Sequence, residues 1–188
     1  MLRMLHRLGG TEGAEIAEAA LVLPIVFTFL LGIIWFGRAF NIYSTITHAA
    51  QQGALTAARP ACATCAQGCD WKDGGGNDTH FPCKATVESS VVSVMNASSL
   101  DSNQIMQYMP VVLSCPDPAP PSRCETTGSS ITICRSVLLN PSNAVPPPPP
   151  QCGTIVSFQY PFKFNLPFTS LNMQQIVLKA QGQSRMEN

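Results

Sequence analysis

"GAEIAEAALVLPIVFTFLLGIIWFG", residues 13–37, is the stretch of sequence that decides the fold. No charged residue occurs in residues 19–36, and these 18 residues would form about 27 Å of helix. That length just spans the hydrocarbon core of a bilayer, which is about 30 Å thick. A simple anchor needs neither the carboxylates of Glu15 and Glu18 at the inner end of the run nor a proline, Pro24, inside it. The sequence therefore predicts a membrane helix whose inner end has a further task.

Basic residues near the apolar run indicate its orientation. Arg3 and Arg7 precede it and Arg38 follows it, which favours a cytoplasmic N-terminus and an exported remainder. A cleavable secretory signal is the alternative, because the small residues of positions 47–58 could mark a cut. Such a signal has an apolar region of only about 7 to 15 residues and a basic head. We therefore expect one span, with the N-terminus inside and the remainder outside, rather than a secretory signal.

The net charge of the chain gives no general attraction for nucleic acid or an anionic surface. Its 188 residues include 11 Lys and Arg and 11 Asp and Glu, so no net field attracts nucleic acid. Charged residues are only 12% of the chain, against about 25% in ordinary soluble domains. Part of the chain is therefore expected in lipid, and part is rich in small polar residues and proline. We expect neither a nucleic-acid partner nor a cofactor.

The membrane helix is predicted to continue outward as an amphipathic stalk. Small and apolar residues recur at spacings of three and four on one face, which is typical of a helix; they are Ile42, Ile46, Ala49, Ala50, Gly53, Ala54 and Ala57. Pro60 cannot donate to a helix and disfavours helical geometry at its predecessor. The helix should therefore end near Arg59.

The remaining residues predict a small α+β domain. Residues 84–99 place Val87, Val91, Val94 and Met95 on one face, as in a short helix, although so many valines leave a strand possible. Four strand candidates are residues 104–114, 131–139, 154–164 and 174–186. The third alternates cleanly, which predicts a sheet with one face in water; its apolar set is Val156, Phe158, Tyr160, Phe162 and Phe164, and its polar set is Ser157, Gln159 and Lys163. Pro110 and Pro161 should lie at edges or bulges.

Eight cysteines lie beyond the apolar run, as expected for disulfides in an oxidising compartment; they are Cys62, Cys65, Cys69, Cys83, Cys115, Cys124, Cys134 and Cys152. A tetrahedral metal site at the first four, with His80, is the weaker alternative because no second ligand pair matches the first. Any pairing is a guess among 105 possibilities. The local choice is Cys115 with Cys124 and Cys134 with Cys152.

The sequence also predicts two loops, and it shows no hydrolytic motif. A cysteine-rich loop covers residues 61–83, and its acidic part, 70–78, resembles a solvated turn more than a calcium loop. A proline-rich loop covers residues 140–151 and contains a five-proline run, which we interpret as a stiff spacer rather than a docking ligand. No G-x-S-x-G elbow or other hydrolytic set is present, so we do not expect an enzyme.

The inner end of the helix resembles the cleavage site of type IV prepilins. Glu18 stands five residues after Gly13 and directly before the apolar run, and Pro24 follows six residues later. Within that class the stretch is similar to TadE-like proteins, the minor pilins or pseudopilins of the tight-adherence (Tad) pilus. The last strand candidate is similar to the end of such proteins more loosely. The resemblance covers residues 13 to about 58.

The resemblance implies processing and assembly. A prepilin peptidase would cut between Gly13 and Ala14, with Gly10 and Thr11 as the alternative site. Glu18 and Pro24 would serve assembly, with Glu18 pairing with the new amino terminus of a neighbouring subunit. The implied partners are the peptidase, other minor pilins, the major pilin, membrane lipid and the inner-membrane assembly platform.

The implied organisation is a cytoplasmic leader (1–13), a transmembrane and stalk helix (14–59) and an extracytoplasmic α+β domain (60–188). The helix would cross the bacterial inner membrane once, with the domain periplasmic or extracellular. The alternative to a pilin is a single-span binding protein or adhesin that does not polymerise. A secreted enzyme with an uncut anchor is the third possibility.

Overall fold

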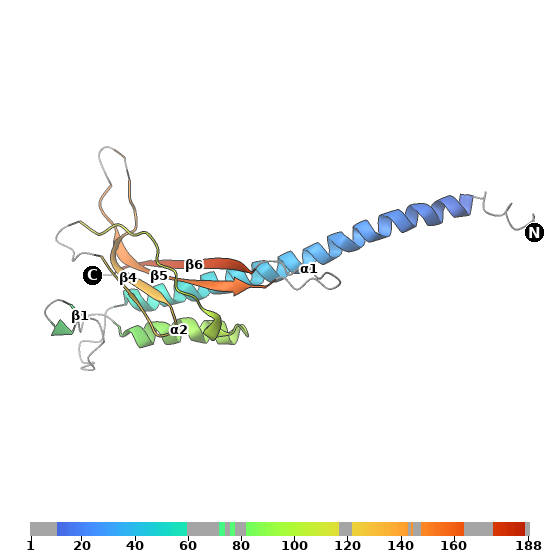
Figure 1. Ribbon diagram of the computed structural model, residues 1–188. Coiled ribbons are helices and arrows are strands. Elements are labelled where there is room, and N and C mark those ends of the chain that lie inside the picture. Colours follow the sequence, from blue (N-terminus) through green and yellow to red (C-terminus); the bar gives the residue numbers. More distant parts are fainter. Residues whose placement is uncertain are drawn as a thin grey trace, which may run out of the picture. The chain divides into compact units, whose positions relative to one another are not determined.

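The computed structural model describes residues 11–59, 72–73, 76–77, 82–116, 122–142, 144, 148–163 and 175–186. Figure 1 draws the rest as a thin grey trace. The chain divides into two compact units, Met1–Asn41 and Ile42–Asn188. One long helix contributes its first part to the first unit and its last four turns to the second.

The described elements form an α+β fold, as predicted. Four strands make one antiparallel sheet in the order β3-β4-β5-β6, and β1 pairs with β2 in a separate short hairpin. In chain order the elements are α1 (Thr11–Ala58), β1 (Lys72–Asp73), β2 (Gly76–Asn77), α2 (Lys84–Ala97), the 3-10 turn η2 (Ser102–Gln104), β3 (Arg123–Thr126), β4 (Thr132–Leu138), β5 (Cys152–Phe162) and β6 (Ile176–Arg185).

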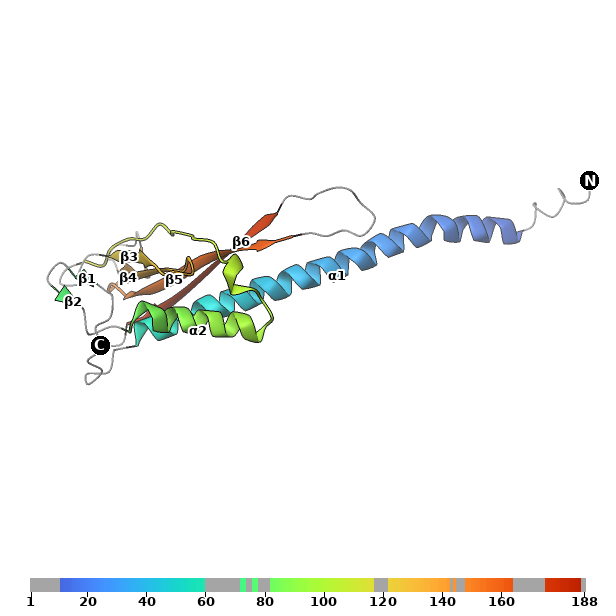
Figure 2. The same cartoon turned by 60° about the horizontal axis from the view of Figure 1, so that its bottom comes forward.

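The last turns of α1 form the centre of the second unit rather than a stalk apart from it. The predicted helical face is confirmed, because every one of its residues after Ile42 is buried. Helix α1 ends at Ala58, directly before Arg59, also as predicted. These turns and α2 cover the same face of the sheet (Figures 1 and 2).

Small side chains on this part of α1 allow backbones to approach closely. A Cβ added to Gly182 of β6 would lie 2.3 Å from the carbonyl carbon and oxygen of Ala50. A Cβ added to Gly53 of α1 would lie 2.6 Å from a methyl carbon of Val91 in α2 and 3.2 Å from one of Val156 in β5. The two glycines therefore set the distance between α1 and its neighbours.

The face of the sheet toward the helices carries the main core. The predicted apolar set of β5 is confirmed at Val156, Phe158, Tyr160 and Phe162, while Phe164 lies outside the described residues. The predicted helix at residues 84–99 is also confirmed, since Val87, Val91 and Met95 are fully buried and Val94 packs against the same cluster.

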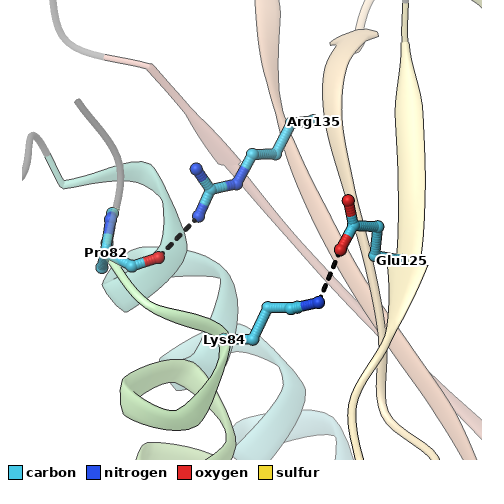
Figure 3. Close-up of polar contacts among 4 residues, drawn as sticks. All are labelled: Pro82, Lys84, Glu125 and Arg135. Atoms are coloured by element: carbon cyan, nitrogen blue, oxygen red, sulfur yellow. Dashed lines mark hydrogen bonds and ion pairs between the residues drawn. The ribbon is translucent and has the colours of Figure 1, made fainter. Parts of the chain in front are cut away.

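Two polar contacts attach the start of α2 to the sheet (Figure 3). Lys84 Nζ lies 2.6 Å from the Glu125 Oε2 atom of β3. The guanidinium of Arg135, on β4, donates from Nη2 to the carbonyl oxygen of Pro82 at 3.0 Å. One turn further along α2, the Ser129 hydroxyl donates to the carboxylate of Glu88. Helix α2 therefore lies at the β3–β4 side, and α1 lies at the β5–β6 side.

The prediction of a sheet face in water is wrong at its centre. Ser157 is fully buried, and its hydroxyl donates to the carbonyl oxygen of Tyr108 at 2.9 Å. An extended segment, residues 105–115, crosses this outer face and pairs with it only at isolated bridges. The alternation of β5 predicted which residues face the helices, but it could not show that a distant segment covers the other side.

One of the four predicted strands is wrong for the same reason. Residues 104–114 do not form a sheet strand, and Pro110 lies buried within the crossing segment. The remaining strand of the four-stranded sheet is β3, which the sequence pattern did not predict. Pro161 does lie at a local edge, since β4 pairs with β5 only as far as Ser157 and β6 alone pairs with it there.

Candidate functional site

The first unit offers a bare apolar helix. Helix α1 has 48 residues, about 72 Å of helix. None of the described side chains from residue 15 to residue 41 is buried, although large apolar residues dominate this stretch. It is the one described helix that is long and apolar enough to cross a membrane.

The predicted processing residues lie at the inner end of this helix. Gly13 is exposed and, with Ala14, belongs to α1, which the structure describes from Thr11 onward. Gly10 lies outside the described residues.

The two carboxylates differ in their relation to the apolar run. Glu15 and Glu18 are both exposed on α1. Glu18 is four residues after Ala14 and three after Glu15, so the three positions lie on one side of the helix. Glu18 differs from Glu15 in being the last charged residue before the apolar run.

Pro24 does not interrupt α1, which the structure assigns as helix on both sides of it. Proline has no N–H, so the carbonyl of Ala20 lacks its usual partner in the helix. The hydroxyl of Thr28 donates to the Pro24 carbonyl. The Ala20 carbonyl has lost its helical hydrogen bond, and the Pro24 carbonyl also accepts from the Thr28 hydroxyl. Both features weaken the helix near Pro24.

One face of α1 beyond Pro24 is a shallow apolar groove. Thr28 and Gly32 are four residues apart on it, and a Cβ added to Gly32 or Gly37 would meet nothing within 4 Å. Larger residues line its sides, among them Ile25, Phe29, Ile33, Phe36 and Phe40. At its outer end the Arg38 guanidinium lies 6.0 Å from the centre of the Trp35 ring. Aromatic and basic residues of this kind are enriched where a helix leaves the bilayer.

The disulfides of the second unit differ from the predicted pairing. Cys115 joins Cys152, and Cys124 joins Cys134. Cys124 and Cys134 face each other across β3 and β4, and the crossing segment brings Cys115 to the start of β5. The local guess was wrong because strand register, rather than distance along the chain, decides which cysteines meet.

The cysteine-rich loop lies largely outside the described residues. Cys83 is disulfide-bonded, whereas Cys62, Cys65 and Cys69 lie outside the description, as do His80 and the side chains of residues 70–78. In the described part of the chain, no group of three or more His, Cys, Asp or Glu side chains could hold a metal ion.

Sequence reasoning missed a polar link at one end of the sheet. The backbone N–H of Asp101 donates a hydrogen bond to the phenol oxygen of Tyr160, whose pKa is nevertheless raised, because burial outweighs that bond. The Asp101 carboxylate accepts from the backbone N–H and side chain of Asn103 and from the side chain of Gln104, which lowers its pKa. The D-x-N spacing at 101–103 was the available signal, since Asp commonly precedes a turn in this way.

Together these features define a class of protein: a chain with one exposed apolar helix at its N-terminal end, a carboxylate at the inner lip of that helix, and a small disulfide-linked α+β domain built around its outer end. A family model described as TadE-like protein matches residues 13–55. The match confirms the resemblance of the N-terminal segment and supports a role related to the Tad pilus in general terms, in a family of pilin-type structural proteins. No curated protein and no solved structure gives a significant match.

Proposed function

We propose that this chain is a minor pilin or pseudopilin of a Tad pilus, a structural subunit that acts by assembly. The observation that carries the proposal is the family match over residues 13–55, which begins at the glycine expected to precede the cut. It covers the exposed part of α1 and most of the helical face buried in the second unit. The proposal therefore rests on α1 rather than on the rest of the α+β domain.

In the proposed processing step, a prepilin peptidase removes residues 1–13. Gly13 precedes the bond, and glycine is the residue least favourable to helix after proline. This lowers the cost of opening the substrate backbone. The cut converts a neutral amide at Ala14 into a cationic amine.

That amine gives Glu18 a partner. A carboxylate near hydrocarbon costs about 3 kcal/mol unless it is paired or lifted to the interface. We propose that Glu18 pairs with the Ala14 amine of a neighbouring subunit and so fixes the register of two helices. Glu15 is three residues nearer the N-terminus and does not border the apolar run, so it serves as the matched control.

The apolar stretch of α1 is proposed to cross the inner membrane with its N-terminus in the cytoplasm. The Thr28–Gly32 groove gives the helix a face on which another pilin helix could approach closely, because small residues four apart favour such contacts in lipid. The proposed partners are sister minor pilins, the major pilin and the assembly platform. Assembly would exchange lipid contacts for helix contacts.

Processing is tested on the native protein by intact mass. A mature chain that begins at Ala14 is expected, and one that begins at Thr11 would move the cut to the alternative glycine. Gly13→Leu should block the cut because a side chain then occupies the site, whereas Gly10→Leu should leave it unchanged. A native chain that retains residues 1–13 would refute the processing step.

Assembly is tested separately with Glu18→Ala and Glu15→Ala. We expect both variants to be cut, and only Glu18→Ala to be absent from purified fibres. Equal incorporation of the two variants would reject the pairing role. An intact wild-type chain that is absent from fibres altogether would instead favour the non-polymerising adhesin.

A further inference from the structure

The last strand of the sheet presents a long free edge. Strand β6 pairs with β5 through ten consecutive residues without a bulge, from Ile176 opposite Phe162 to Arg185 opposite Gly153. No described strand pairs with its other side, since the sheet order ends at β6. It contains no proline, and Ile176 and Val177 are 48% and 42% exposed. Alternate backbone N–H and C=O groups of β6 therefore point away from the sheet.

A groove follows this edge. It has a volume of about 490 Å³ and is lined by Gln51 and Leu55 of α1 and by Gln181, Gly182 and Gln183 of β6. Leu55 is 49% exposed, which gives the groove an apolar wall. An added strand would gain backbone hydrogen bonds from β6 and contacts for its side chains from Leu55 and the glutamine amides.

The described residues beside this edge carry charge of one sign, whereas Glu187, two residues after Arg185, lies outside them. From residue 42 to 59 and from 175 to 186 the charged residues are Arg59, Lys179 and Arg185, and no carboxylate occurs in either stretch. Lys179 and Arg185 are exposed and six residues apart, so they share a face of β6 about 20 Å from end to end. The described acidic residues of the unit, Asp73, Glu88, Asp101 and Glu125, belong to β1, α2, the approach to η2, and β3.

We propose that β6 accepts an added strand from a protein partner, an extended segment whose carboxylates stand six residues apart and meet Lys179 and Arg185. The inference stands apart from the proposed pilin function, which rests on the N-terminal helix. It assigns the α+β domain a docking surface of its own.

A lysine on an edge strand often serves instead to prevent pairing. Here the Lys179 ammonium lies 4.9 Å from the centre of the Tyr108 ring, on the segment that crosses the outer face of the sheet. The ammonium therefore lies over the outer face of the sheet, the face that a carboxylate of an added strand would share, and the backbone edge of β6 stays open.

The test uses the full chain in detergent with a synthetic peptide, Thr-Glu-Thr-Val-Thr-Val-Thr-Glu-Thr, whose two carboxylates are six residues apart. Fluorescence anisotropy measures its binding, and a peptide with both Glu residues replaced by Lys is the control. Hydrogen exchange across residues 176–185 reports whether the backbone pairs. We expect binding of the acidic peptide only, with slower exchange at alternate amides of β6.

Charge reversals then locate the contact. Lys179→Glu and Arg185→Glu should each weaken binding about threefold to tenfold, as expected for exposed charge pairs turned from attractive to repulsive. Arg123→Glu, on β3 at the opposite edge of the sheet, should leave it unchanged. Equal binding of the basic peptide, or unchanged exchange in β6, would overturn the proposal. Protection of β6 that grows with protein concentration in the absence of peptide would also overturn it, because the edge would then pair with a second copy.

Discussion

Gly182→Ala tests the contact that holds α1 to the sheet. The added Cβ would lie 2.3 Å from two backbone atoms of Ala50 and 2.4 Å from the backbone nitrogen of Gln51. Backbone atoms cannot rotate away, so α1 and β6 must separate by about 1 Å to reach ordinary contact. Such overpacking costs about 3 kcal/mol, and the loss of chain freedom in the unfolded state returns up to about 1 kcal/mol. We expect a net destabilisation of about 2 kcal/mol.

For a unit of this size, a loss of about 2 kcal/mol lowers the unfolding midpoint by about 4–8 °C. Thermal proteolysis of the full chain in detergent, with the disulfides intact and cuts mapped within β5 and β6, measures the second unit without interference from the membrane helix. Gly128→Ala is the control, because its Cβ would meet nothing within 4 Å. It should change the midpoint by about 1–2 °C at most. A Gly182→Ala midpoint equal to that of the control would refute the close helix–strand contact.

Three further outcomes follow from the second unit. Replacing Cys124 and Cys134 together by Ser should cost about 2–3 kcal/mol, measured by the same proteolysis, and peptide mass mapping of the unreduced wild type should show that bond. Burial raises the pKa of Tyr160 above 10.0. The stability that depends on its neutral phenol is therefore complete below pH 10.0 and falls as the pH rises through the raised value. Tyr160→Phe should flatten this alkaline loss in a series of thermal unfolding midpoints measured at increasing pH. Lys84→Ala should cost less than about 1 kcal/mol, because the ion pair with Glu125 is partly exposed; a loss above about 2 kcal/mol would contradict this.

The periodic elements of the fold could be predicted from the sequence, because burial on one face leaves a spacing in the chain. The helical face from Ile46 to Ala57 and the alternating face of β5 are examples. Strand β3 was missed because four mostly polar residues, RCET, carry little pattern. A signal was present in "CETTGSSITIC", where Cys124 and Cys134 stand at equal distances from the turn and so face each other across a hairpin.

The crossing segment could not be predicted in the same way. Residues 106–113 alternate, with Met106, Tyr108, Pro110 and Val112 more buried than Gln107, Met109, Val111 and Leu113, so by pattern they resemble a strand. What distinguishes them is that only isolated residues pair with the sheet. That outcome depends on contacts between distant parts of the chain. The free edge of β6 also depends on strand order, which no local pattern encodes.

The change in residue size along α1 explains how one helix serves two surroundings. Up to about Phe40 its side chains are large, apolar and exposed, which suits lipid or a neighbouring helix. From Ala49 to Ala58 its inward side chains are Ala and Gly, which let the sheet approach the backbone. Because Gly182 lies directly on the backbone at Ala50, a shift of the helix along its axis must carry β6 with it. If the chain has the proposed pilin role, a looser contact at Gly182 should therefore weaken assembly even where Glu18 is intact.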